Sequence, residues 1–287
     1  MPRLIIVSAW LLALGLLTSW GLGSLMVRGH PSDVAAARPP AMDFTLRSRD
    51  GTRIAATWWP GRTATSPAIL LLHGVDASRN ATAPNAAWLA SRGYAALAID
   101  FRGHGRSAIT PRSFGLDEAM DAQAAFDWLK RRQHGAPIAV IGISLGGAAT
   151  LLGKAGPLPA DALILQAVYP DIRHAIRDRI AARLTAGPAW LLEPLLSFQS
   201  RPRFGVWPSR LAPLEALKRY HGAVFVIGGG ADRYTPPAES RALFDAAPGR
   251  KAFWLVPGAD HAATSSLADA AWRSRVSAFL RQTIGPA

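Results

Sequence analysis

The chain has 287 residues, of which 49% are hydrophobic, so it can bury a large core as one α/β domain with a short appendage. It contains no cysteine, which excludes disulfides, cysteine-ligated zinc and a cysteine nucleophile but fits any compartment. The formal net charge is +13, and because the basic residues are nearly all arginine, a coding bias toward arginine and alanine accounts for it. The sequence has no RNP-like run, zinc spacing or basic tail that would indicate nucleic-acid binding. Attraction to anionic lipid is therefore a better functional explanation of the positive charge than binding to nucleic acid.

The first segment, residues 1–28, predicts a transmembrane anchor or a signal segment. Leu4 to Val27 carry no charge, and roughly 20 apolar residues suffice to cross a bilayer. A cleaved signal peptide has a shorter apolar region of about 7–15 residues, so the length favours an uncleaved anchor. Small residues at 35–37 would still permit later processing. The basic residues before the apolar segment nearly balance those after it, so charge determines the orientation only weakly. We expect the main domain to lie outside the inner membrane of a bacterium.

The next stretch, residues 29–42, holds three prolines and little periodicity, and it predicts a linker. Residues 44–48 and 53–59 then flank Asp50-Gly51, which predicts a β-hairpin. Apolar runs that predict strands follow at residues 68–72, 94–99, 137–141, 162–167, 223–227 and 251–256. Helices are expected at 116–132 and after Ser144. Alternating strands and helices predict one α/β domain over 43–287, a mainly parallel sheet covered by helices on both faces.

One segment, about residues 169–210, interrupts this alternation. Ile172, Ile176, Ile180 and Leu184 recur every four residues, with arginines on another face, which predicts a basic amphipathic helix. Apolar residues follow at 190–198. Two interpretations remain open: the segment packs against the core, or it forms a helical cap with an apolar acyl-binding surface.

The strongest motif is Gly142-Ile143-Ser144-Leu145-Gly146, between a predicted strand and a predicted helix. A serine with glycines two positions away on either side is the nucleophile elbow, a turn so tight that a Cβ at those positions would collide with its neighbours. The alternative is an ordinary strand-to-helix turn in which Ser144 only caps the helix. Because the motif stands between a predicted strand and a predicted helix, we expect Ser144 to be a nucleophile.

A serine hydroxyl needs a base, and the base needs a carboxylate to orient it. Of the seven histidines, His261 directly follows the last predicted strand, where a loop can bring the ring over the sheet edge. Asp232 follows the strand before it and fits the chain order serine, acid, histidine. Asp171 is the rival acid, whereas Asp260 neighbours His261 in sequence and should point away from it.

Acyl transfer also needs donors for a tetrahedral oxyanion. We expect these donors to be the backbone N–H groups of Leu145, at the helix start, and of Val75, in the loop after strand 68–72. His73 in that loop is expected to be structural, because no further ligands have the spacing of a zinc site.

Four ordered motifs together resemble the α/β-hydrolase superfamily over about residues 43–283. They are Leu71-Leu72-His73-Gly74, the run Asp100-Phe101-Arg102-Gly103-His104-Gly105, the elbow, and the pair Asp232 and His261. The combination is similar to the Bem46-like and serine aminopeptidase-type group, some of whose members carry an amino-terminal membrane anchor. The resemblance implies a triad of Ser144, Asp232 and His261, an oxyanion hole at Val75 and Leu145, and a structural role for His104. Val75 stands where relatives often have Asn or Ala, which narrows the pocket but leaves the backbone donor.

The expected function is a serine hydrolase that cleaves ester-type acyl bonds through an acyl-serine intermediate, without metal or cofactor. The anchor, apolar cap and basic helix favour lipid-like or medium-chain esters. A peptidase or thioesterase on the same scaffold, and a noncatalytic membrane binding protein, are the alternatives. The sequence assigns no oligomeric state.

Overall fold

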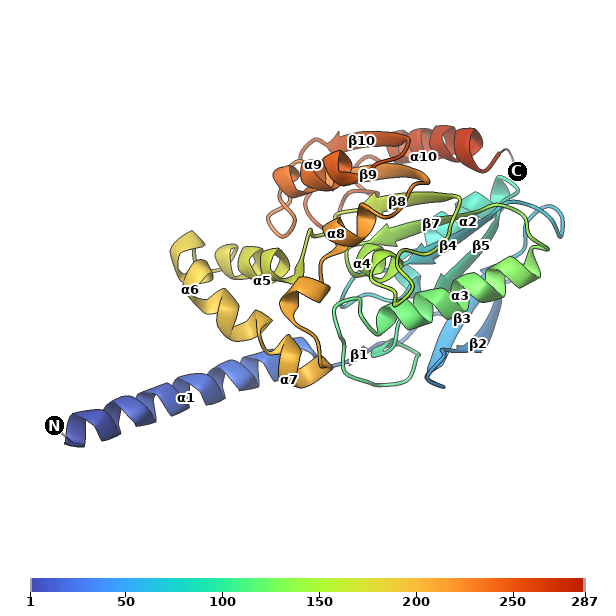
Figure 1. The fold of residues 1–287 in the computed structure, drawn as a ribbon. Coiled ribbons are helices and arrows are strands. Elements are labelled where there is room, and N and C mark those ends of the chain that lie inside the picture. The colour runs from blue at the N-terminus through green and yellow to red at the C-terminus, as the bar shows by residue number, and fades with distance from the viewer. Residues whose placement is uncertain (1, 286–287) are drawn as a thin grey trace.

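An eight-stranded, mainly parallel sheet forms the centre of the computed structural model, which describes residues 2–285 (Figure 1). The strand order is β10-β9-β8-β7-β4-β5-β3-β2, and only the pairings of β3 with β2 and with β5 are antiparallel. The strands are β2 (Met42–Arg47), β3 (Arg53–Trp59), β4 (Ala68–Leu72), β5 (Ala95–Ile99), β7 (Ile138–Ile143), β8 (Ala162–Gln166), β9 (Ala223–Gly229) and β10 (Lys251–Val256). This is the architecture that the alternation of elements predicts.

Helices cover both faces of the sheet because its central strands are buried on both sides. In β4, Leu70 and Leu72 pack into one apolar layer, whereas Ile69 and Leu71 pack into the other. The first layer is covered by α3 (Glu118–Arg132), α4 (Leu145–Leu151), α8 (Pro213–Leu217) and α9 (Pro237–Ala246). The second is covered by α2 (Ala83–Ser91) and α10 (Asp269–Thr283), with Trp272 fully buried. The described residues also form two short 3₁₀ helices, η1 (Arg79–Ala81) and η2 (Pro208–Arg210).

The segment that interrupts the alternation is helical, with α5 (Ile172–Ala181), α6 (Ala186–Ser197) and α7 (Ser200–Phe204). We call these three helices the cap; they extend from the sheet on the side of α1 (Figure 1). The predicted basic helix is α5, but it ends at Ala181 rather than reaching Leu184. Ile172 and Ile176 are buried against Leu211, so the apolar stripe faces the protein.

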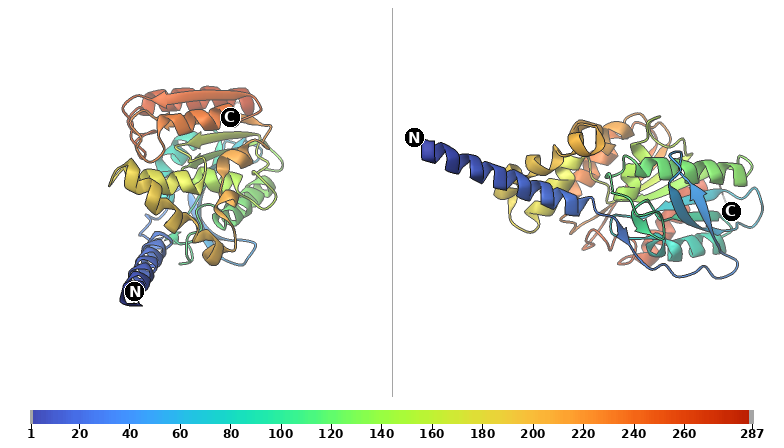
Figure 2. Two further views of the ribbon diagram at one scale, coloured as in Figure 1. Left: turned by 60° about the vertical axis from the view of Figure 1, so that its left-hand side comes forward. Right: turned by 90° about the horizontal axis from the view of Figure 1, so that it is seen from below.

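Helix α1 (Pro2–Met26) projects from the rest of the molecule in every view (Figures 1 and 2). Its Ile6–Met26 portion is long and apolar enough to cross a membrane, a property that signal sequences share. Only its carboxyl-terminal part contacts the cap, where the Ser19 hydroxyl donates to the Leu195 carbonyl at 2.8 Å.

The predicted linker lies against the domain rather than away from it. Within it, β1 (His30–Pro31) pairs in parallel with β6 (His104–Gly105), and the His30 N–H donates to the Gly103 carbonyl at 2.6 Å. Val34 and Ala41 are buried. This stretch therefore runs along the surface of the domain, held by backbone pairing and burial of two apolar side chains, and does not act as a free spacer after α1.

Candidate active site

Ser144 stands at the sharp turn between β7 and α4, in a strained backbone conformation. Its φ is 49° and its ψ is −109°, in a region that residues with a Cβ rarely adopt. A Cβ at Gly142 would lie 2.7 Å from the backbone of Gly147, and one at Gly146 would collide with the Leu72 carbonyl. Both glycines are therefore required for α4 to pack this closely against β4 and β7, which is the reason that the sequence pattern suggested.

The structure brings the three predicted side chains together at the carboxyl edge of the sheet. The His261 Nε2 atom lies 3.1 Å from the Ser144 Oγ, and its Nδ1 lies 2.8 Å from the Asp232 Oδ2. Since Asp232 accepts the Nδ1 hydrogen, Nε2 is left to accept the serine proton. The geometry is that of a nucleophile, a base and an orienting carboxylate.

Asp232 is held in place by the loop that it begins. Its Oδ1 accepts the N–H groups of Tyr234 at 2.8 Å and Thr235 at 2.9 Å, so the other oxygen is free for His261. The two rival carboxylates bind elsewhere. Asp171 caps α5 and accepts from the His174 Nδ1 at 2.8 Å, and Asp260 accepts two backbone N–H groups of its own loop.

Leu145 is the first residue of α4, where backbone N–H groups have no intrahelical partner. Val75 follows Gly74, whose position is close to the nucleophile, because a Cβ there would lie 3.6 Å from the Ser144 Cβ. The His73 Nδ1–H donates to the Gly74 carbonyl at 2.7 Å. That carbonyl belongs to the same planar peptide unit as the Val75 N–H, so His73 fixes the direction of the donor.

His73 itself is fully buried and uncharged. Its Nε2 accepts the Phe101 N–H at 3.1 Å, and the ring meets the Phe101 ring edge-on at 5.1 Å. Burial, with a smaller contribution from the neighbouring His104, lowers the pKa of His73 to about 3. His73 is thus a neutral donor over the physiological range, as its predicted structural role requires.

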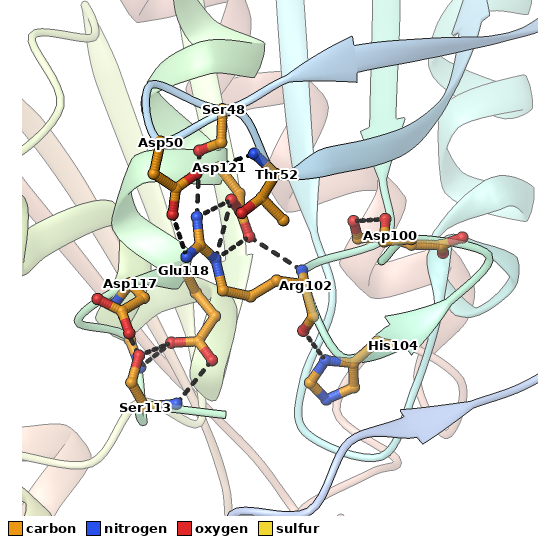
Figure 3. Close-up of polar contacts among 12 residues, drawn as sticks. Ser48, Asp50, Thr52, Asp100, Arg102, His104, Ser113, Asp117, Glu118 and Asp121 are labelled. Atoms are coloured by element: carbon orange, nitrogen blue, oxygen red, sulfur yellow. Dashed lines mark hydrogen bonds and ion pairs between the residues drawn. The ribbon is translucent and has the colours of Figure 1, made fainter. Parts of the chain in front are cut away.

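The Arg102-Gly103-His104-Gly105 turn is held by a buried polar network (Figure 3). The Arg102 side chain donates to Asp121 on α3 at 2.7 Å and to Asp50 in the β2–β3 hairpin at 2.7 Å. The His104 Nδ1 donates to the Arg102 carbonyl at 2.9 Å. The network joins α3, the β2–β3 hairpin and the turn. These residues therefore stabilise the fold next to the site and do not contact Ser144.

Two residues that the sequence did not single out connect the cap to His261. The Tyr234 ring meets the His261 imidazole edge-on at 5.6 Å, and the Arg179 guanidinium of α5 lies 5.4 Å from the centre of the Tyr234 ring. The position of Tyr234, two residues after Asp232, was the available signal. Ser144 is only 2% exposed, and these two side chains lie between α5 of the cap and the imidazole that contacts its hydroxyl.

The low pKa of His73 predicts a pH-dependent contribution to stability. In the unfolded chain a histidine binds its proton near pH 6.5, whereas folded His73 binds it only near pH 3. The unfolded state therefore holds the extra proton between these values, and stability falls as the pH is lowered through them, with a limiting slope of about 1.4 kcal/mol per pH unit for one proton.

Urea unfolding of wild type and His73→Asn at several pH values measures this term. Asn keeps a donor for the Gly74 carbonyl but cannot titrate, and His104 is common to both chains. The wild type should be the more stable chain at pH 7, and its advantage should shrink as the pH falls. A stability difference that stays constant with pH would contradict a neutral, buried His73.

Comparison with known proteins relates the chain to a family. The family described as serine aminopeptidase, S33, matches residues 63–201. The uncharacterized protein Rv2307c of Mycobacterium tuberculosis is 30% identical over 236 residues, covering 81% of this chain and 76% of that protein. Lysophosphatidylserine lipase ABHD12 of Macaca fascicularis is 34% identical over 151 residues, covering 49% of this chain and 37% of the relative.

Among solved structures, the esterase Pf2001 of Pyrococcus furiosus superposes with a TM-score of 0.70 at 24% identity, covering 90% of this chain and 99% of that one. This likeness confirms the predicted fold class. Together with the sequence matches, this shows that the chain belongs to the α/β-hydrolase superfamily, in its serine aminopeptidase-like branch, as the resemblance implied.

Proposed function

We propose that this hydrolase is a serine esterase that acts through an acyl-Ser144 intermediate. The observation that supports it most directly is the pair of contacts from His261, one to the Ser144 hydroxyl and one to the Asp232 carboxylate. A serine in such an elbow, in contact with an imidazole that is itself held by a carboxylate, is suited to nucleophilic acyl transfer.

The proposed reaction follows from these contacts. His261 takes the Ser144 proton as the Oγ attacks the ester carbonyl, and the oxyanion accepts hydrogen bonds from the Val75 and Leu145 N–H groups. The imidazolium, stabilised by Asp232, then protonates the departing alkoxide as the carbon–oxygen bond of the ester breaks. Water repeats the sequence: His261 removes its proton, hydroxide attacks the acyl carbon, and Ser144 leaves with the proton returned to its oxygen.

The nucleophile and the acid are tested by two substitutions with a matched control. Ser144→Ala should lower kcat by roughly 10⁵–10⁶ and abolish labelling by a fluorophosphonate probe, while circular dichroism shows an intact fold. Asp232→Asn should lower kcat by about 10⁴ because it disturbs the His261 tautomer. Asp171→Asn should change kcat little, since Asn caps a helix as well as Asp.

Other results would contradict this mechanism or identify a different acid. Probe labelling that survives in Ser144→Ala would assign the nucleophile to another residue, and the absence of labelling in the wild type would support the alternative of a noncatalytic binding protein. A loss in Asp171→Asn equal to that in Asp232→Asn would assign the orienting carboxylate to Asp171.

We further propose that the substrates are lipid-like or medium-chain esters. The support is the apolar surface of the cap, together with the lipase activity in the name of one relative. With p-nitrophenyl esters, kcat/KM should rise from acetate through butyrate to octanoate as the acyl chain buries more apolar surface. A strict preference for acetate, or faster hydrolysis of aminoacyl p-nitroanilides than of any ester, would contradict this substrate class.

We propose that α1 is an uncleaved anchor and that the catalytic domain lies on the periplasmic side of a bacterial inner membrane. The apolar length of Ile6–Met26 supports the anchor. Because the chain has no cysteine, Ser274→Cys on the exposed face of α10 introduces a unique thiol. In cells whose outer membrane is permeabilised, this thiol should react with an impermeant maleimide. Labelling only after the inner membrane is broken would reverse the orientation.

A further inference from the structure

Helix α6 is oriented with its polar and small residues toward the protein and its large apolar residues outward. Ala189, Glu193 and Ser197, spaced by four residues, are at most 1% exposed. We define the outer face of α6 by the large residues that point away from the domain, whose exposed fractions are 61% at Trp190, 79% at Leu191, 40% at Leu192 and 45% at Leu195. An ordinary surface helix in water has the opposite arrangement.

This orientation is fixed by ionic contacts and is not a chance rotation. Glu193 accepts hydrogen bonds from the Nε and Nη2 atoms of Arg173 on α5 at 3.0 Å and 2.9 Å, and Arg177 lies 3.5 Å from the same carboxylate. Turning the outer face inward would carry Glu193 away from Arg173 and Arg177, break these contacts and bury the α5 side of the helix without a partner for the two cations, which is unfavourable. The sequence therefore commits α6 to presenting tryptophan and leucine outward.

The outer face lies beside α1, whose Ile6–Met26 portion is long and apolar enough to cross a membrane. The Ser19 hydroxyl of α1 donates to the Leu195 carbonyl at 2.8 Å, and the Gln199 Nε2 donates to the Ser19 carbonyl at 2.9 Å. Ser19 precedes the end of α1 at Met26 by about two helical turns, or about 10 Å. If α1 crosses a bilayer with Met26 at the boundary, α6 lies at the depth where amphipathic helices enter the acyl layer.

Charged and aromatic groups around this contact suit a lipid surface. The Arg177 guanidinium lies 3.7 Å from the centre of the Trp190 ring, and that of Arg203 lies 3.9 Å from the centre of the Trp20 ring on α1. Arginine and tryptophan at one level are typical of the headgroup region, where the ring takes the interface and the cation meets lipid phosphate.

We propose that the outer face of α6 is seated in the acyl layer of the bilayer that α1 crosses, so that the cap meets its substrate as an ester resident in that membrane. This inference rests on the proposed anchor and deepens the proposed esterase function. Because α6 is hydrogen-bonded to α1, an α1 that crosses a bilayer holds α6 at membrane depth, and the occupant of the face is then lipid. Through α5, whose Arg179 lies over Tyr234 beside His261, the seated cap borders the triad.

Spin labelling in the full-length chain tests the position of α6 without reference to catalysis. A nitroxide on Leu191→Cys, reconstituted into phosphatidylcholine–phosphatidylglycerol vesicles, should collide freely with oxygen and be shielded from a water-soluble nickel chelate. The matched label on Ser274→Cys, on α10 far from α1 and α6 in Figure 1, should show the reverse. Equal exposure of both labels to nickel would overturn the proposal. Dipolar broadening between Leu191→Cys labels in detergent without lipid would also overturn it, by assigning the face to a second copy of the chain.

A second measurement connects this position to activity. Leu191→Asp should lower hydrolysis of an acyl ester embedded in vesicles by about tenfold or more, because withdrawing one leucine from the apolar phase weakens the seating of the outer face of α6 in the acyl layer by about that factor. Hydrolysis of soluble p-nitrophenyl butyrate should be unchanged. Met42→Asp, at an exposed apolar residue of β2 on the opposite side of the sheet, should affect neither substrate.

The two proposals fail in distinguishable ways. Absence of p-nitrophenyl butyrate hydrolysis in every chain would overturn the esterase function and leave the spin-label result to decide the position of α6. Equal vesicle activity in wild type and Leu191→Asp would overturn the role of the outer face in reaching substrate, whatever the soluble activity.

Discussion

The close approach of α4 to β4 and β7 is the constraint on which the site depends. It is possible only because Gly142 and Gly146 lack side chains, and it forces Ser144 into a conformation that the surrounding core must hold. The apolar layers on both faces of the sheet supply that hold, since the strands beneath the turn are buried throughout. Packing in the core and strain at the nucleophile are thus parts of one arrangement.

Around this turn, each polar group that lies near the serine is oriented by another group behind it. Asp232 is fixed by two backbone N–H groups, and His261 is fixed by Asp232. The peptide between Gly74 and Val75 is fixed by His73, whose own ring is fixed by the Phe101 N–H. Preorganisation of this kind suits chemistry in which charge develops quickly and the surroundings must not rearrange.

Much of this arrangement could be predicted from the sequence because its signals are local. Apolar runs of strand length, the glycines around Ser144, and a single histidine after the last strand indicate the sheet, the turn and the base without knowledge of tertiary contacts. Asp232 needed the chain order of the fold as well, because Asp171 also follows a strand. Which partner each of these carboxylates contacts depends on the conformation of its loop. That conformation is set by backbone hydrogen bonds, which residue types and their spacing do not predict.

The cap and the first strand could not be predicted in the same way, because their structure depends on distant partners. The run Trp190-Leu191-Leu192 fits a core-facing helix as well as an outward-facing one, and the difference is decided by Arg173 meeting Glu193 from another helix. Likewise, the sequence of the proline-rich stretch after α1 predicts a linker. Its position against the domain depends on the hydrogen bond between His30 and the backbone of the Arg102 turn, which lies far away in the sequence.

That last pairing determines how freely the domain can move once α1 is embedded. A flexible tether would let the domain swing and reach neighbouring surfaces, whereas β1, which pairs with β6 in a separate two-stranded sheet, holds the chain against the domain a few residues after α1 ends. With α1 in a bilayer, the domain would keep one orientation toward it, and the lipids that it encounters would be those diffusing in that same leaflet. Its encounters would then depend on lateral diffusion and on the number of such molecules per unit area, and vesicles that merely collide with the membrane would stay out of reach.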